Sequence, residues 1–181
     1  MFAAARSFRA QTIAHRLFST VKVGDKLPSA LVAVVKYGPE GFKSETVDTS
    51  KYFENKHVVL VGYPGAFTPT CMATHIPDYI NNASQLKEQG ADEIIAMSVN
   101  DPFVVSAFAE KLGGKHHVNF IADGNGEFTK ALGLELDLSV AQLSTRGKRM
   151  SMVVKNNSVI SMNNEDGPGL TEVSSCSTVL G

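Results

Sequence analysis

The sequence predicts an α/β fold, a three-layer α/β/α sandwich with a mixed central sheet and helices on both faces. Apolar, β-branched runs at 57–63, 93–99 and 118–122 alternate with segments of helical periodicity, which is typical of parallel strands in a β-α-β-α-β unit. Two strand-like runs at 150–155 and 158–163 follow as an antiparallel hairpin. With 181 residues, 43% of them hydrophobic, the chain has enough apolar material for one well-filled core.

The first elements are expected to be antiparallel strands. Residues 31–37 and 43–48 flank the turn GPEG, in which proline and glycine suit positions that other residues resist. The run HVVLVGY at 57–63 then predicts a central strand buried on both faces, and a loop rich in proline and glycine ends it.

Three helices are predicted. A long one spans about 70–88, with Gly90 as its stop and a kink at Pro77, because apolar residues recur every three or four positions. A second, amphipathic helix covers 103–112, and a short one at 173–180 closes the fold. The hairpin at 150–163 turns at Asn156 and Asn157, a pair that favours a tight turn.

The N-terminal 20 residues differ in composition from the rest. They are rich in Arg, Ala and Ser and lack acids, which is typical of a transit peptide, so residues 1–20 are predicted to be a removable mitochondrial presequence and 21–181 the folded domain. A disordered basic tail is the alternative. Residues 1–18 hold three arginines, so without them the formal charge falls from −1 to −4, which disfavours a nucleic-acid partner. Apolar runs fall short of the roughly 18 residues that cross a bilayer, so no membrane association is expected.

Cysteine and histidine usage argues against a metal site. The chain has two cysteines and five histidines, with no C-x-x-C and no paired Cys/His spacing for zinc, and the adjacent His116 and His117 would point in different directions. We therefore expect neither metal nor organic cofactor. The remaining interpretation is that a cysteine serves as a redox group or a nucleophile.

Cys71 lies in the stretch VGYPGAFTPTCMATHIP, among turn residues and hydroxyls. It falls in the first turn of the predicted long helix, with Thr68 or Thr70 available as cap. The free N–H groups and the positive dipole end of a helix stabilise an anion there, which favours a reachable thiolate. A small buried core residue is the alternative for a lone cysteine.

The motif PGAFTPTC, followed by His75 and Pro77, resembles the active-site stretch of the peroxiredoxins, in particular the type II or peroxiredoxin-five-like branch. The likeness runs from about residue 21 onward and includes SVNDPFV at 98–104, DGNGEFTKALGL at 123–134 and RGKRMSMVV at 146–154. It implies a thioredoxin-like fold and a thiol peroxidase without cofactor. Such an enzyme reduces hydrogen peroxide and alkyl hydroperoxides through a cysteine sulfenic acid and serves antioxidant defence and redox homeostasis.

The resemblance also assigns roles to residues. It makes Cys71 the peroxidatic cysteine, Thr68 a hydroxyl that bonds the sulfur and the peroxide, Pro64 the shield of the pocket, and Arg146 the cation that stabilises the leaving oxygen. Lys148 and Arg149 are interpreted as surface charges or structural pairs. His75 shares a helix face with Cys71, but we expect it to pack or anchor a loop rather than act as base. Met72 replaces a serine that is frequent in the family.

The resolving thiol remains open. Cys176 lies in the C-terminal region where relatives keep a resolving cysteine, but it comes four residues later than the Gly-Leu-Thr register implies. It is therefore either the resolving thiol or a buried residue of the last helix. In the second case thioredoxin, glutaredoxin or glutathione would reduce the sulfenic acid.

The resemblance further implies a homodimer, with Phe103 and Phe67 as candidate contacts; burial of both in the monomer is the alternative. The mitochondrial matrix is the predicted location, with cytoplasm or peroxisome as alternatives. Two other functions stay open. A redox sensor would use Cys71 without turnover, and a thiol-disulfide oxidoreductase is disfavoured because the sequence has no C-x-x-C.

Overall fold

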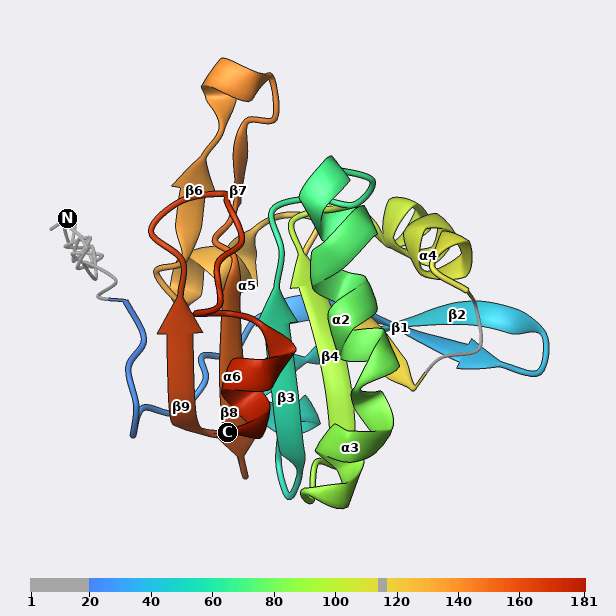
Figure 1. Ribbon diagram of the computed structural model, residues 1–181, viewed down its shortest axis with the longest axis vertical. Coiled ribbons are helices and arrows are strands. Elements are labelled where there is room, and N and C mark those ends of the chain that lie inside the picture. The colour runs from blue at the N-terminus through green and yellow to red at the C-terminus, as the bar shows by residue number, and fades with distance from the viewer. Residues whose placement is uncertain (1–19, 114–116) are drawn as a thin grey trace, which may run out of the picture.

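The computed structural model describes residues 20–113 and 117–181, so all of the predicted presequence except residue 20, and His116, lie outside the described residues (Figure 1). Seven strands form one sheet in the order β2-β1-β5-β4-β3-β8-β9. Their bounds are β1 Leu31–Gly38, β2 Gly41–Asp48, β3 His57–Gly62, β4 Glu93–Ser98, β5 Val118–Ala122, β8 Met150–Lys155 and β9 Ser158–Asn164.

The sheet is mixed, as predicted. β3, β4 and β5 are parallel neighbours in its middle, and the two hairpins β1–β2 and β8–β9 pair antiparallel to them. The hairpin turn at Asn156 and Asn157 has φ values of 48° and 62°, a left-handed conformation that asparagine tolerates and that a two-residue turn requires.

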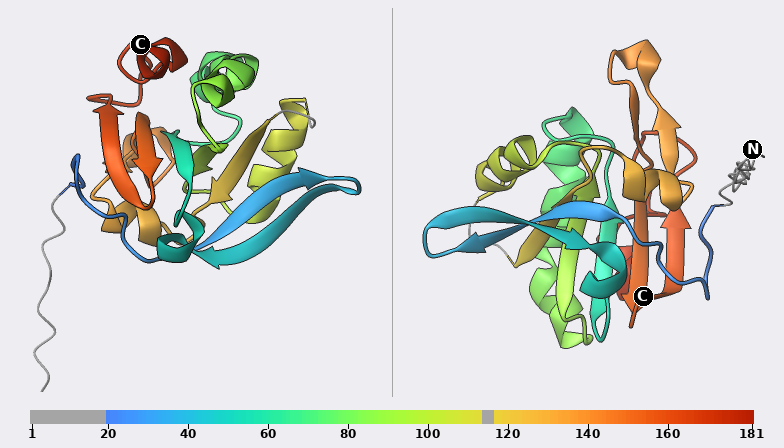
Figure 2. Two further views of the ribbon diagram at one scale, coloured as in Figure 1. Left: turned by 90° about the horizontal axis from the view of Figure 1, so that it is seen from below. Right: turned by 180° about the vertical axis from the view of Figure 1, so that it is seen from behind.

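Helices cover both faces of the sheet (Figure 2). One buried cluster packs α2 Ile76–Asn81, α3 Ala83–Glu88, α4 Pro102–Lys111 and α6 Cys176–Leu180 on one face. A second cluster on the other face includes Phe53, just after α1 Thr49–Tyr52, and Phe128 of α5 Glu127–Ala131. The three-layer α/β/α prediction is therefore confirmed. Within the described residues, no helix is both long and apolar enough for a membrane span.

The predicted long helix is divided. Pro69 and Thr70 are helical, Cys71–His75 form a π-helical turn (η1), and α2 and α3 follow, separated at Asn82. The N–H of Ile76 donates to the carbonyl of Cys71, five residues back. Pro77 has no N–H and its ring would crowd the carbonyl of an ideal preceding turn, so a wider turn before it relieves this conflict. The distortion therefore precedes Pro77.

The segment between β5 and β8 holds elements that periodicity did not predict. Besides α5 it contains β6 Glu135–Asp137, the 3₁₀ turn η2 Ser139–Ala141 and β7 Thr145–Gly147. β6 and β7 form a separate two-stranded arm that projects from the body of the molecule (Figure 1). The last helix, α6, begins at Cys176 rather than 173 because the Ser175 side chain caps it there.

Candidate active site

Cys71 is the third helical residue after the loop that follows β3, so the prediction that it lies in the first helical turn is correct. Its side chain is 0% exposed, in contrast to the expected reachable thiol. Thr70 already has helical backbone angles and makes no side-chain cap. Thr68 instead accepts the N–H of Met72 at its carbonyl oxygen, at 3.0 Å.

Burial alone would describe a core cysteine, but a buried cation contacts the sulfur of Cys71. Nη1 and Nη2 of Arg149 each lie 3.5 Å from the Cys71 Sγ, and Arg149 is only 2% exposed. A buried guanidinium is costly unless its charge and its donors are matched. The two N–H contacts with Cys71 Sγ are of the kind that charge-assisted hydrogen bonds to sulfur require.

Each nitrogen of the Arg149 guanidinium, which has five N–H donors in total, has acceptors within hydrogen-bond distance. Besides the two contacts with sulfur, Nη1 lies 2.9 Å from His75 Nδ1 and Nη2 donates to the Pro168 carbonyl at 2.8 Å. Nε donates to the carbonyls of Pro168 and Gly169, both at 3.1 Å. No carboxylate within residues 20–113 and 117–181 pairs with this guanidinium, so its positive charge stays available to the sulfur and to a substrate.

His75 anchors this arrangement. It is fully buried, and its Nε2 lies 3.3 Å from the carbonyl oxygen of Ser174. Burial, and then the charge of Arg149, lower the pKa of His75 from 6.5 to about 4. The neutral ring thus accepts a hydrogen bond from Arg149 at Nδ1 and donates one at Nε2. The predicted anchoring role is supported, and the ring's protonless Nδ1 faces arginine rather than sulfur.

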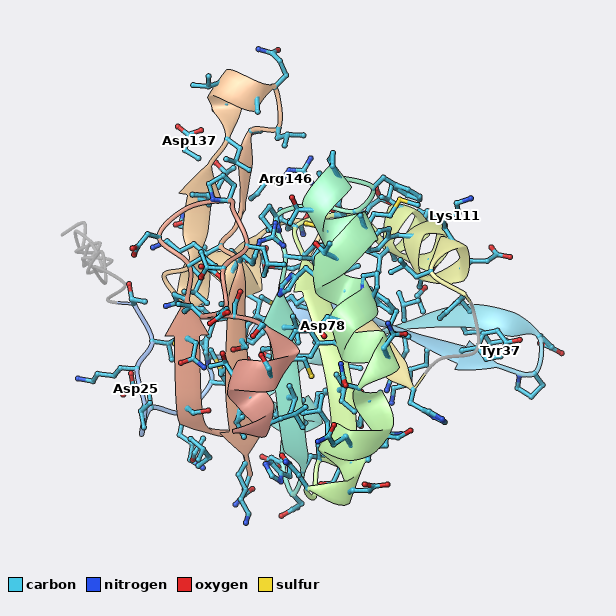
Figure 3. All side chains as sticks on the ribbon, in the orientation of Figure 1. Asp25, Tyr37, Asp78, Lys111, Asp137 and Arg146 are labelled. Atoms are coloured by element: carbon cyan, nitrogen blue, oxygen red, sulfur yellow. The ribbon has the colours of Figure 1, made fainter. Side chains whose placement is uncertain are left out.

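Arg146 is not the guanidinium beside the sulfur, which corrects the sequence-based assignment. Its Nε donates to the Leu143 carbonyl at 2.7 Å and its Nη1 to the Val99 carbonyl at 2.9 Å. Arg146 belongs to β7 at the base of the arm (Figure 3), and its Nη1 would be 3.6 Å from a Cβ placed on Gly65. It therefore braces the edge of the cysteine loop. The interpretation of Arg149 as a surface charge is wrong.

Strand pairing explains why Arg149 reaches the cysteine. β3 and β8 are antiparallel neighbours, with Gly62 opposite Met150. The residue before β8 therefore lies beside the loop that leaves β3 and leads to Cys71. Arg149 directly precedes the predicted 150–155 strand, so pairing that strand with 57–63 would have identified it.

Two further predicted site residues lie in the same loop. Pro64 is buried, and the Thr68 hydroxyl donates to the Gly65 carbonyl at 2.9 Å. A hydroxyl has one hydrogen, so the Thr68 hydroxyl must rotate before it can donate to the sulfur or a peroxide. Cys71 is 0% exposed, so a peroxide can contact the sulfur only after neighbouring groups move.

Cys176 occupies a different place. It is the first residue of α6 and fully buried, and its N–H donates to Asp78 Oδ2 at 2.9 Å. Asp78 is seven residues beyond Cys71, about two helical turns along the chain. Cys176 of α6 therefore packs beside a different turn from the one that carries Cys71. Both thiols are free. Burial, and then the charge of Asp78, raise the pKa of Cys176 to about 12, which makes it a poor nucleophile.

No group of three or more His, Cys, Asp or Glu side chains able to hold a metal occurs within the described part of the chain. The groups gathered at the site are one sulfur, a buried cation and the polar groups of the loop.

Comparisons with known proteins agree with this chemistry. Residues 22–180 match the Redoxin family model. The chain is 42% identical to Peroxiredoxin-2D of Arabidopsis thaliana over 160 residues, which cover 88% of this chain and 96% of that protein. It is 37% identical to the mitochondrial Peroxiredoxin-2F of the same plant over 175 residues, covering 93% and 87%.

Solved structures agree as well. The reduced Prx3 of Vibrio vulnificus in complex with H₂O₂ is 38% identical and superposes with a TM-score of 0.79, covering 89% of this chain and 98% of that one. The chain therefore belongs to the Redoxin family, and within it to the type II peroxiredoxins. Its activity is that of a thiol peroxidase, an oxidoreductase that acts on peroxides.

Proposed function

We propose that Cys71 is the peroxidatic cysteine and that Arg149 is the cation that activates it, with Thr68 and Pro64 forming the substrate side of the site. The observation that carries this proposal is the pair of 3.5 Å contacts from a buried guanidinium to the Cys71 sulfur. The same guanidinium places a positive charge beside the sulfur, where it can stabilise negative charge that develops on a peroxide oxygen during the attack.

The proposed reaction is a two-electron substitution at oxygen. The Cys71 thiolate attacks one oxygen of ROOH, an S–O bond forms and the O–O bond breaks, and the leaving RO⁻ takes a proton to become ROH. The sulfur is oxidised to sulfenic acid while the peroxide is reduced. Arg149 stabilises the thiolate before the attack and the negative charge on the departing oxygen during O–O cleavage. Only the stabilisation that grows in the transition state speeds the reaction.

Stopped-flow measurement of H₂O₂ consumption tests these roles. Cys71→Ser is expected to abolish consumption, whereas Cys176→Ser, the matched control that removes the other thiol, is expected to retain the fast first oxidation. Slow, non-catalytic oxidation of the wild type would favour a redox sensor instead. Equal loss in both variants would refute the assignment of Cys71.

An external thiol is proposed as the reductant. The burial of Cys176, its raised pKa and its contact with Asp78 support a structural rather than a resolving role. Mass spectrometry after one equivalent of peroxide is expected to find a trappable sulfenic acid at Cys71. A Cys71–Cys176 bridge would contradict this. Comparing turnover with thioredoxin, glutaredoxin and glutathione then identifies the donor.

We also propose a homodimer. Phe103 is 84% and Phe67 47% exposed, so the alternative of burial within the monomer is wrong. Their segments are joined by a hydrogen bond of 3.0 Å from the Ala66 N–H to Asn100 Oδ1, and we take the two exposed phenylalanines on these adjoining segments as the dimer face. Sedimentation should give a dimer for the wild type and a monomer for Phe103→Asp; an unchanged mass in the variant would count against this face.

The proposed location is the mitochondrial matrix, with residues 1–20 as a cleaved transit peptide. The acid-free, arginine-containing composition of this segment supports the proposal, and one relative of 37% identity is named as mitochondrial. Fusing residues 1–20 to a fluorescent protein should direct it to mitochondria, whereas a fusion in which Arg6, Arg9 and Arg16 are changed to Ala should remain cytosolic. Cytosolic or peroxisomal signal from both fusions would overturn the proposal.

A further inference from the structure

Backbone carbonyls of the segment between β9 and α6 accept hydrogen bonds from Arg149, although this segment does not contact the Cys71 sulfur. Residues 166–175, here called the C-terminal strap, connect β9 to α6. The Pro168 carbonyl accepts from both Nε and Nη2 of Arg149, and the Gly169 carbonyl accepts from Nε. At the other end of the strap, the Ser174 carbonyl accepts the Tyr79 hydroxyl at 2.8 Å and faces His75 Nε2. The position of the strap therefore sets the position of the guanidinium.

One buried carboxylate holds the strap. Glu165 follows β9 directly and is 5% exposed. Its Oε1 accepts the N–H of Thr171 at 3.0 Å and both the N–H and the hydroxyl of Ser174, at 3.2 and 2.7 Å. Its Oε2 accepts the Thr171 hydroxyl at 2.7 Å. Its own N–H donates to the Arg149 carbonyl at 3.0 Å, so the carboxylate is fixed relative to the arginine backbone.

Glu165 holds the strap through its ionised carboxylate, which can accept from all of these donors. Burial raises the pKa of Glu165, but hydrogen bonds from Ser174 and Thr171 outweigh burial and hold that pKa below its ordinary value. The negative charge is matched by strap donors and not by the guanidinium. Neutral carbonyls therefore hold Arg149 in place without neutralising the charge that faces Cys71.

We propose that Glu165 is a positioning residue of the peroxidase: its carboxylate fixes the C-terminal strap, and the strap carbonyls hold the Arg149 guanidinium against the Cys71 sulfur. This inference rests on the proposed roles of Cys71 and Arg149. A glutamine at 165 keeps the size but removes the negative charge and replaces one acceptor oxygen with an NH₂ group. At the Oε2 position this group loses the bond from the Thr171 hydroxyl, and at the Oε1 position it loses the three bonds from Thr171 and Ser174. The strap would then shift and carry the guanidinium with it.

The test compares Glu165→Gln with Glu172→Gln, a control that makes the same charge change at an exposed residue of the same strap. A displacement of the guanidinium by a fraction of an ångström is expected to slow the reaction with H₂O₂ roughly tenfold to a hundredfold in Glu165→Gln. The pH profile of that rate should also move to higher pH, because a displaced cation stabilises the thiolate less. Glu172→Gln should match the wild type in both respects.

Loss of folding has a different signature. It lowers the fraction of active protein but leaves the pH profile of the surviving fraction unchanged, and that result would overturn the inference. Thr171→Val, which removes only one tie to Glu165, provides a milder variant that should show the same shift to a smaller extent. In an Arg149→Lys background, Glu165→Gln should cost much less than in the wild type, since it acts through the guanidinium.

These measurements also separate the two proposals. If Arg149→Lys is slow while Glu165→Gln reacts like the wild type with an unmoved profile, only the positioning role fails. If Arg149→Lys itself reacts like the wild type, the proposed function of the arginine fails first.

Discussion

Replacing Arg149 with lysine tests the site most directly, because it keeps the charge and removes the geometry. The guanidinium places two N–H groups at 3.5 Å from the Cys71 sulfur while its other donors are held by His75 and the strap. A lysine ammonium can direct at most one donor to the sulfur from this position. Losing one preorganised donor costs about 2.7–4 kcal/mol of transition-state stabilisation, so the rate with H₂O₂ should fall by roughly 10²- to 10³-fold.

The variant should also be less stable. Lysine cannot donate at once to His75 Nδ1 and to the strap carbonyls, and an unpaired buried acceptor costs about 1–3 kcal/mol. Stopped-flow rates should therefore be measured on protein whose folded fraction is known from denaturant unfolding.

Arg146→Lys is the matched control, since it makes the same substitution three residues earlier, where the guanidinium bonds the carbonyls of Leu143 and Val99. It should lose much less rate than Arg149→Lys, because Arg146 contacts the edge of the cysteine loop and not the sulfur. The reasoning is refuted if the Arg146 variant loses as much rate as the Arg149 variant, or if Arg149→Lys reacts as fast as the wild type.

Two further predictions concern stability. Because the pKa of His75 is about 4 in the folded protein and 6.5 for a solvent-exposed imidazole, the unfolded chain binds more protons between these values. The free energy of unfolding, measured by urea titration, should therefore fall by about 3 kcal/mol as pH drops from 6.5 to 4. His75→Gln should lack most of this pH dependence, because its amide does not titrate but can still accept from Arg149 and donate to Ser174. An equal slope in both proteins would contradict the neutral buried ring. In Gly62→Ala the new Cβ would lie 2.9 Å from the Lys148 carbonyl and 2.9 Å from the Met150 side chain, so unfolding should become easier by about 1–3 kcal/mol. Gly38→Ala is the control, because its new Cβ would meet only the Gly41 carbonyl at an ordinary 3.7 Å. A wild-type melting temperature for Gly62→Ala would show that the strands separate more readily than their pairing indicates.

Local sequence was sufficient for most of the sheet. β-branched runs predicted β3, β4 and β5, and turn residues predicted both hairpins, because burial on a sheet and tight turns each depend on a few adjacent residues. Short elements such as β6, β7 and α5 were missed because they are too brief to show periodicity. The π-turn at Cys71–His75 has no distinct hydrophobic period either.

For the active site, the sequence by itself determined the cysteine and its loop, since residues 64–71 are contiguous and a helix start favours an anion wherever it occurs. The choice of Arg149 over Arg146 depended on the pairing of β3 with β8, a contact between strands far apart in the chain. The strap, Glu165 and the neutral state of His75 were likewise decided only by tertiary structure. Burial and hydrogen bonding depend on which segments meet, and spacing along one segment does not contain that information.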